Sequence, residues 1–178
     1  MNTGRRSFIQ ASGGLILAGL ASTARLSHAE GPIDIAMMGT PGGARVWFQP
    51  IGLLIDVGQT IRWTNRDPGN SHTATAYHPS LYKKAQRIPD SAKPWDSGFL
   101  LPDESFSLTL TVPGVYDYYC LPHEHAGMVG RIIVGHPETD GWQTRAEAQQ
   151  GVPAAALQKF PSIEQIMKER VVSGAASG

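Results

Sequence analysis

Short stretches of alternating apolar and polar residues dominate the middle of the chain. The clearest is Glu104–Thr111, where Phe106, Leu108 and Leu110 alternate with serine and threonine. A period of two is typical of a strand with one buried face. Further stretches of this kind are separated by proline and glycine: Ile33–Met37, Arg45–Phe48, Leu53–Val57, Thr60–Asn65, His72–Tyr77, Val115–Cys120 and Val129–Val134. About eight short strands with turn residues between them predict an all-β protein, a β-sandwich over residues 30–135.

A longer polar stretch, His78–Asp103, interrupts this pattern. Its prolines oppose continuous secondary structure, although a short helix over Ser80–Gln86 is compatible with the residues. The stretch is locally basic through Lys83, Lys84, Arg87 and Lys93. Two interpretations stay open at this point: an ordinary solvated loop, or a docking patch for an acidic partner protein.

The composition changes after Gly135. Trp142–Gln150 and Ala154–Phe160 are compatible with helices, and Ser162 followed by Gln165 resembles a capping box at the start of a last helix. Residues 136–178 are therefore expected to form a short C-terminal helical extension packed on the sandwich. Residues 173–178 contain only serine, glycine and alanine and are expected to be disordered.

Residues 1–29 have the features of an export signal. Arg5 and Arg6 lie in a segment that resembles a twin-arginine motif, and an uncharged stretch, Ser7–Ala24, follows it. Small residues before the end of the segment predict cleavage after Ala29. The alternative is an uncleaved membrane anchor, but the stretch is short and rich in glycine for a spanning helix. We expect a periplasmic protein, exported by the twin-arginine route, with no stable membrane insertion after cleavage.

Charge and composition narrow the class of protein. The 178 residues are 41% hydrophobic, which is enough for a core, and include 15 basic and 15 acidic side chains. Without residues 1–29, 12 basic and 15 acidic side chains remain, a net charge of −3. Nucleic-acid binding needs a concentrated basic face, so no nucleic-acid partner is expected.

One segment concentrates residue types that bind metals. It holds the only cysteine, Cys120, with His123 three residues later and Met128 eight residues later. Copper prefers thiolate, imidazole and thioether ligands, and two histidines, one cysteine and a weak axial methionine form a blue-copper site. Pro122 turns the chain so that His123 can face the same metal, and Gly127 lets the loop reverse. A bound metal would also explain a lone cysteine in an oxidising compartment.

The remaining ligand must come from elsewhere in the chain. His72, near the start of a predicted strand, is the candidate, and His78 is its competitor. On one strand these two residues would lie about 20 Å apart, so both cannot bind one copper. His125 and His136 are expected at the surface.

The segment Tyr118–Met128 resembles the C-terminal copper loop of the cupredoxins, in particular that of the plastocyanin, pseudoazurin and amicyanin group. The Cys-x-Pro-His spacing and the position of the methionine both match. A second similarity, Gly58–Asn65 followed by His72, lies where that family supplies its first histidine ligand. The resemblance covers about residues 33–135. It implies that one copper, cycling between Cu⁺ and Cu²⁺, is held by His72, Cys120, His123 and Met128.

The same resemblance implies a Greek-key sandwich that carries single electrons between other redox proteins and is not an enzyme. In the family the loop histidine reaches the surface through an apolar patch, which implies an electron exit at His123 beside Pro122 and Ala126. In many relatives an asparagine follows the first histidine ligand, and its backbone helps to hold the thiolate. Here Thr73 stands in its place, and a backbone N–H can still bond the sulfur.

Other functions would need residues that differ from this set. A copper-dependent oxidoreductase, similar to a nitrite reductase or an oxidase, needs a second copper held by extra histidines. That site would have to lie between subunits and use His78, His125 or His136. A copper chaperone or storage protein would favour several cysteines or a methionine-rich segment. A cysteine hydrolase would need an orienting Asn or Asp near Cys120 and His123, and none is evident.

Overall fold

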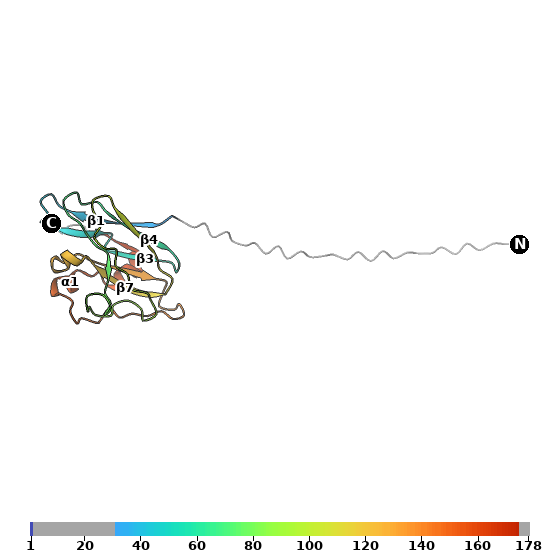
Figure 1. The fold of residues 1–178 in the computed structure, drawn as a ribbon. Coiled ribbons are helices and arrows are strands. Elements are labelled where there is room, and N and C mark those ends of the chain that lie inside the picture. Colours follow the sequence, from blue (N-terminus) through green and yellow to red (C-terminus); the bar gives the residue numbers. More distant parts are fainter. Residues whose placement is uncertain (2–30, 175–178) are drawn as a thin grey trace.

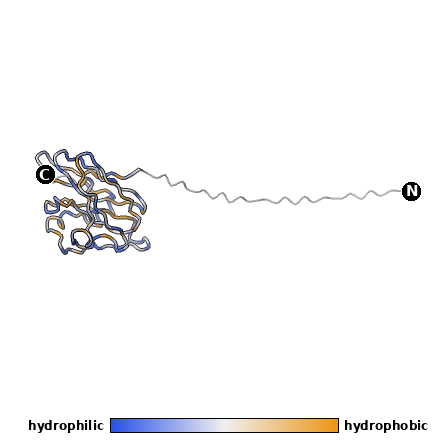
Figure 2. The backbone as a smooth tube through the Cα atoms, in the orientation of Figure 1, coloured by the Kyte–Doolittle hydropathy of each residue, from blue (hydrophilic) through white to orange (hydrophobic). Residues whose placement is uncertain are grey.

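Two β-sheets pack face to face, and the C-terminal segment covers the outer side of one of them (Figure 1). The structure is a computed structural model and describes residue 1 and residues 31–174. The expected export signal, apart from Met1, and residues 175–178 lie outside this range. Apolar residues lie mainly within the sandwich, and polar residues lie mainly on the connecting loops (Figure 2). The predicted all-β sandwich with a short C-terminal helical extension is confirmed.

The first sheet contains four strands in the order β2-β1-β4-β6. Their bounds are β1 Ile33–Gly39, β2 Val46–Gln49, β4 Thr60–Asn65 and β6 Ser105–Thr109. β1 runs parallel to β4 and antiparallel to β2, and β6 is antiparallel to β4. In β6 the serines and threonine are exposed, whereas Phe106 and Leu108 are half-buried, as the alternation predicts.

The second sheet contains five strands in the order β5-β7-β8-β3-β9. Their bounds are β3 Gly52–Ile55, β5 Thr75–Ala76, β7 Gly114–Tyr119, β8 Val129–Val134 and β9 Val171–Val172. Every residue of β7 and β8 is buried, because the sandwich core covers one face of these strands and the C-terminal segment covers the other. β9 was not predicted, since two residues give no periodic pattern.

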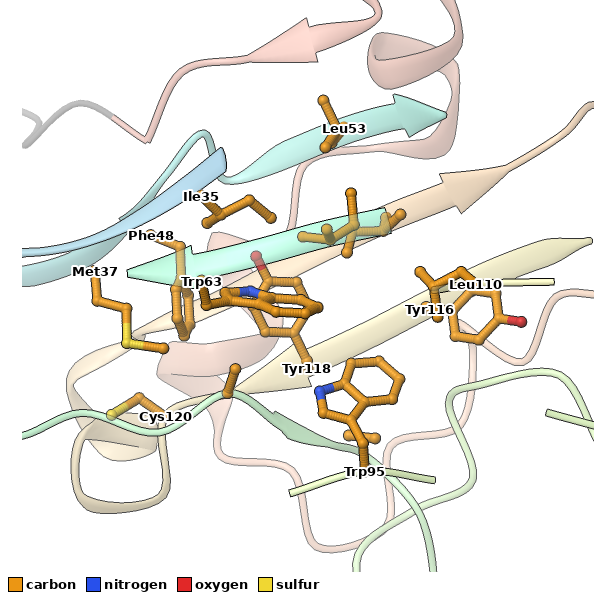
Figure 3. Close-up of a cluster of buried hydrophobic side chains, with 14 of the residues drawn as sticks. Ile35, Met37, Phe48, Leu53, Trp63, Trp95, Leu110, Tyr116, Tyr118 and Cys120 are labelled. Atoms are coloured by element: carbon orange, nitrogen blue, oxygen red, sulfur yellow. The ribbon is translucent and has the colours of Figure 1, made fainter. Parts of the chain in front are cut away.

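The core between the sheets is built around aromatic rings. Trp63 is fully buried, and its ring centroid lies 5.4 Å from that of Tyr118, 5.9 Å from Trp95 and 6.0 Å from Phe106. Cys120 belongs to the same cluster and lies at its edge in Figure 3, away from Leu110 and Tyr116. The only thiol of the chain therefore lies at the edge of the apolar core, shielded from solvent.

The C-terminal segment contains two short helices, α1 Ala154–Lys159 and α2 Ile163–Glu169. The hydroxyl of Ser162 accepts a hydrogen bond of 3.0 Å from the backbone N–H of Gln165, so Ser162 caps α2 as predicted. The second bond of a capping box is replaced, because the side chain of Gln165 bonds to Glu169. The expectation of a helix over Trp142–Gln150 is wrong. Gln143 bonds to the sheet instead, since its carbonyl accepts from the N–H of Val115, and the residues after it form turns. No helix in residues 31–174 is long and apolar enough to cross a membrane.

A buried ion cluster attaches this segment to the second sheet. The carboxylate of Asp117, on β7, accepts bonds from the Nε atoms of Arg87 at 2.9 Å and Arg131 at 2.7 Å. Arg131 also donates to the carbonyl of Pro161 at 2.7 Å, and Arg87 donates to that of Ala148. The ring of Phe160 lies near both guanidinium groups, at 4.9 and 5.1 Å. The two arginines thus join β7 to the C-terminal segment.

These contacts correct the interpretation of the basic stretch. Arg87 is not part of a solvated loop or a docking patch, because it is 1% exposed and paired with Asp117. Lys84 is also engaged, in an ion pair with Glu124. Of the basic residues considered, only Lys83 and Lys93 are exposed. A helix over residues 80–86 is absent, since Tyr82 and Lys83 both have a φ of 54°, which no α-helix permits.

Candidate metal centre

Three of the predicted ligand side chains meet at the end of β7. Cys120 directly follows that strand, His123 lies in the 3₁₀ helix η1 (Leu121–Ala126), and His72 precedes β5. The Sγ atom of Cys120 lies 3.4 Å from Nδ1 of His123 and 3.6 Å from Nδ1 of His72, and the two Nδ1 atoms are 3.2 Å apart. Within residues 31–174 this is the one group of histidine, cysteine and acidic side chains arranged to hold a metal ion.

The backbone of the loop explains how Cys120 and His123 come to face one another. Pro122 lies in the first turn of η1, where its missing N–H costs nothing. The N–H of His123 donates to the carbonyl of Cys120, and the N–H of Cys120 donates to the carbonyl of Met128, both at 3.0 Å. Gly127 closes the turn with a φ of 79°, a conformation that favours glycine. The loop is therefore a short closed turn whose shape its own backbone fixes.

His72 is held by a buried carboxylate. Its ring is fully buried, and Nε2 lies 3.1 Å from Oδ2 of Asp67, which is 2% exposed. Asp67 also accepts bonds from the backbone N–H of Gly69 at 2.9 Å and the side-chain amide of Asn70 at 2.8 Å. Because all these groups donate to the carboxylate, Nε2 carries the proton and the lone pair of Nδ1 faces Cys120 and His123.

The protonation of these groups follows from burial and hydrogen bonding. Burial acts to raise the pKa of Asp67, but the hydrogen bonds from Asn70, Gly69 and His72 together hold that pKa below its ordinary value. Burial lowers the pKa of His72, and burial together with the nearby His72 lowers the pKa of His123. Neutral imidazoles are the form that binds metals.

The thiol of Cys120 is equally shielded from solvent. Burial raises its pKa to about 11, an effect that the backbone N–H of Thr73 partly opposes. That N–H lies 3.4 Å from Sγ, so the interaction expected at Thr73 is present. The hydroxyl of Thr73 also accepts from the backbone N–H of Leu121 at 2.8 Å. Without a metal the thiol keeps its proton, and metal binding would replace it.

The predicted strand His72–Tyr77 is shorter in the structure, because Thr73 bonds to Cys120 and Leu121. Only Thr75 and Ala76 form a strand there, β5. His72 makes an isolated bridge with Leu100, and the N–H of Ala74 donates to the hydroxyl of Ser97. The first residues of the predicted strand therefore serve the site rather than a regular ladder.

The donor set fits a copper ion. A triangle with sides of 3.2, 3.4 and 3.6 Å has a point about 2.0 Å from each corner, which is the length of a metal–imidazole bond. Two imidazoles and a thiolate around one point are the donors of a blue-copper centre. The side chain of Met128 is fully buried in the same core cluster as Cys120, and its backbone N–H donates to the carbonyl of His123 at 3.2 Å.

The other histidines lie outside this group. Nδ1 of His78 is bonded to the hydroxyl of Ser80 at 2.7 Å, and the ring is half-buried. His125 is exposed, as expected, and His136 is half-buried.

Two acidic residues near the centre were missed from the sequence. Asp67 lies in an Asp-Pro-Gly-Asn run that is typical of a surface turn. Glu124 lies between two loop histidines and looks solvated, yet it is 3% exposed and bonded to the hydroxyl of Tyr77 at 2.7 Å and to Lys84. The one sequence feature that could have indicated the contact between Asp67 and His72 is their separation of five residues.

Comparison with known proteins agrees with this geometry. The family model of copper binding proteins, plastocyanin/azurin family, matches residues 35–135. The chain is 34% identical over 131 residues to the chloroplastic plastocyanin of Oryza sativa subsp. indica, covering 73% of this chain and 80% of that protein. The corresponding values for the plastocyanin of Chlamydomonas reinhardtii are 34% over 121 residues, 68% and 77%. A solved pseudoazurin from Sinorhizobium meliloti aligns with a TM-score of 0.53 and 25% identity, covering 78% of this chain and 94% of that one.

The two-sheet sandwich and the His-Cys-His group together define a copper-binding protein of the cupredoxin type. More specifically, the chain belongs to the plastocyanin/azurin family of copper binding proteins, and its cofactor is one copper ion.

Proposed function

We propose that this protein is a type 1 copper electron carrier in which His72, Cys120 and His123 bind the metal directly. The observation that carries the proposal is the triangle of Nδ1, Nδ1 and Sγ atoms, each about 2.0 Å from a common point. Met128 is the weak axial ligand, supported by its burial beside the cysteine. Copper, when bound, supplies a one-electron couple between Cu(II) and Cu(I).

The surroundings of the donor atoms suit a carrier that must change oxidation state without moving. His72 and Cys120 are fully buried, and each is held by a hydrogen bond from or to a neighbour outside the loop. The loop itself is closed by its own backbone bonds. Ligands that are fixed in this way keep the same positions for both oxidation states, so little energy is spent on reorganisation.

His123 is the exit for the electron. Unlike His72 it is only half-buried, and the neighbouring Pro122 and Ala126 are exposed. A small apolar surface of this kind suits brief docking against other redox proteins, since weak redox encounters use small interfaces. Among the basic side chains considered in the stretch 78–103, Lys83 and Lys93 are exposed and could steer an acidic partner.

The family relationship supports a carrier rather than an enzyme. The alternative, a copper-dependent oxidoreductase with a site between subunits, would use His78, His125 or His136. In the described part of the chain none of these three histidines joins a second group of metal-binding side chains. A periplasmic location, reached through the twin-arginine signal at residues 1–29, remains part of the proposal and is supported by the sequence of that segment.

The visible absorption spectrum of the copper-loaded protein tests the site. We expect the intense thiolate-to-Cu(II) band of a type 1 centre, lost in Cys120→Ser because a hydroxyl is a poor donor to copper. His72→Ala should also destroy the band, whereas the matched control His78→Ala should leave it intact. Retention of the band in Cys120→Ser, or its loss in His78→Ala but not in His72→Ala, would show that the ligands are assigned wrongly.

The exit route is tested by electron self-exchange between two copies of the protein, measured by NMR line broadening in mixtures of the oxidised and reduced forms. Ala126→Lys should slow the exchange at least tenfold without changing the absorption band, because two docked copies would bring two like charges together. The control is Val57→Lys, since Val57 is exposed and lies beyond the opposite end of the second sheet from Cys120. Equal rates in the two variants would refute an exit at His123.

A further inference from the structure

We infer that the carboxylate of Asp67 is a positioning residue that fixes His72 as a neutral Nδ1 ligand and, through its charge, lowers the reduction potential of the centre. The inference rests on the proposed copper site and adds a residue to it. Nε2 of His72 and Oδ2 of Asp67, both buried, are joined by a hydrogen bond of 3.1 Å. A histidine that donates its other N–H to a carboxylate is fixed in tautomer and ring orientation and becomes a more basic ligand.

Asp67 is itself held in place from several sides. Oδ1 accepts from the N–H of Gly69, Oδ2 accepts from Asn70, and the N–H of Asp67 donates to the side chain of Asn65 at 2.9 Å. Asn65 in turn donates to the carbonyl of Leu100 at 2.9 Å, and Leu100 is the bridge partner of His72. The carboxylate and the imidazole are thus fixed relative to each other by two routes, one direct and one through the backbone.

The end of β1 leaves room for this carboxylate. A Cβ atom built on Gly39 would lie 1.8 Å from Oδ2 and 2.4 Å from Cγ of Asp67, so no other residue fits there while Asp67 keeps its position. The φ of Gly39 is not positive, so the glycine answers a need for space rather than a need for an unusual backbone. Glycine at this point and aspartate at residue 67 form one arrangement that serves His72.

The two histidines of the site are therefore unequal. His72 is fully buried and tied to a negative charge, whereas His123 is half-buried, and within residues 31–174 no carboxylate is bonded to it. A buried negative charge one imidazole away from the metal stabilises the more positive oxidation state, because protein interiors screen such charges weakly. His123 is left to face a partner, while His72 and Asp67 set the potential from inside.

The test is the reduction potential of the copper-loaded protein, measured by equilibrium with a mediator of known potential. Asp67→Asn keeps an oxygen that can accept from Nε2 but removes the charge. We expect the equilibrium constant for reduction to rise at least tenfold, which is 59 mV for a one-electron couple. Asp103→Asn is the control, because it removes an equal charge from an exposed carboxylate, and it should change the constant less than twofold.

A second variant separates charge from position. Gly39→Ala leaves the carboxylate in the chain but forces it away from His72, and it should also raise the constant, together with a loss of the slowly exchanging Nε2 proton of His72 in the NMR spectrum of the reduced protein. If Asp67→Asn does not fold, this comparison decides. A change below twofold in the folded variants overturns the inference while the wild-type absorption band still stands. Absence of that band from the wild type would instead overturn the proposed function.

Discussion

Replacing Asp117 with asparagine should lower the free energy of unfolding by about 3–5 kcal/mol, because it leaves two buried guanidinium groups without a counter-charge. The side chain of Asp117 is fully buried, and those of Arg87 and Arg131 are 2% and 7% exposed. Each guanidinium approaches the carboxylate at 2.7–2.9 Å. Asparagine has the same shape, so packing is kept, but its amide N–H groups face other donors. The expected loss is a large part of the roughly 5–15 kcal/mol that stabilises a domain.

Urea unfolding of the copper-free protein, followed by tryptophan fluorescence, measures this loss. Copper must be absent because a ligand that binds only the folded state adds its own stabilisation. With an m value of about 2 kcal/mol/M the midpoint should fall by about 2 M. Asp34→Asn is the matched control, because it breaks an ion pair in which the side chains of Asp34 and Arg62 are 57% and 44% exposed. Solvent screens this pair, so the midpoint should not move measurably. A fall of less than about 0.5 M for Asp117→Asn would refute the reasoning.

Three further outcomes are expected. Met128→Gln should keep copper and lower the reduction potential, since an oxygen donor stabilises Cu(II) more than a thioether does; an unchanged potential and spectrum would make Met128 a core residue only. Burial raises the pKa of Tyr77 and of Tyr116, so above pH 10.0 the unfolded chain releases protons that the folded protein retains. The free energy of unfolding should therefore fall as the pH rises, which unfolding midpoints from pH 8 to 11 would measure. Gly127→Ala should cost about 1–3 kcal/mol in thermal unfolding, because of the φ of 79° and a Cβ placed 2.8 Å from Cγ of Lys159; a neutral result would show that the loop can adjust.

The parts of the site that sequence alone could predict are those set by local spacing. Cys120 and His123 lie in one tight turn, and the chemistry of their side chains limits the metal. Pairing with His72 required the family resemblance, because 48 residues separate it from the cysteine. The strands were predicted well where alternation runs over five or more residues, as in β6, and poorly at β5 and β9, where two residues carry the pairing.

The charged residues were the least predictable. Arg87 and Glu124 have polar neighbours in sequence and look solvated, but each is buried by a partner that is distant along the chain. Arg87 meets Asp117 30 residues later, and Glu124 meets Tyr77 47 residues earlier. Local pattern contains no information on such pairs. The helix expected over residues 142–150 fails at a similar contact, since Gln143 pairs with β7.

The pairing of β9 with β3 determines when, during synthesis, the edge of β3 becomes covered. Leu53 pairs with Val171, so one edge of β3 has no neighbour until Val171 has been made and has left the ribosome. An apolar edge strand with free N–H and carbonyl groups is a template for pairing with other chains. A chain released from the ribosome before residue 171 would therefore fold into a sandwich in which β3 is an unpaired edge strand. Chains that end before Val171 should aggregate, although every metal-binding side chain is present in them.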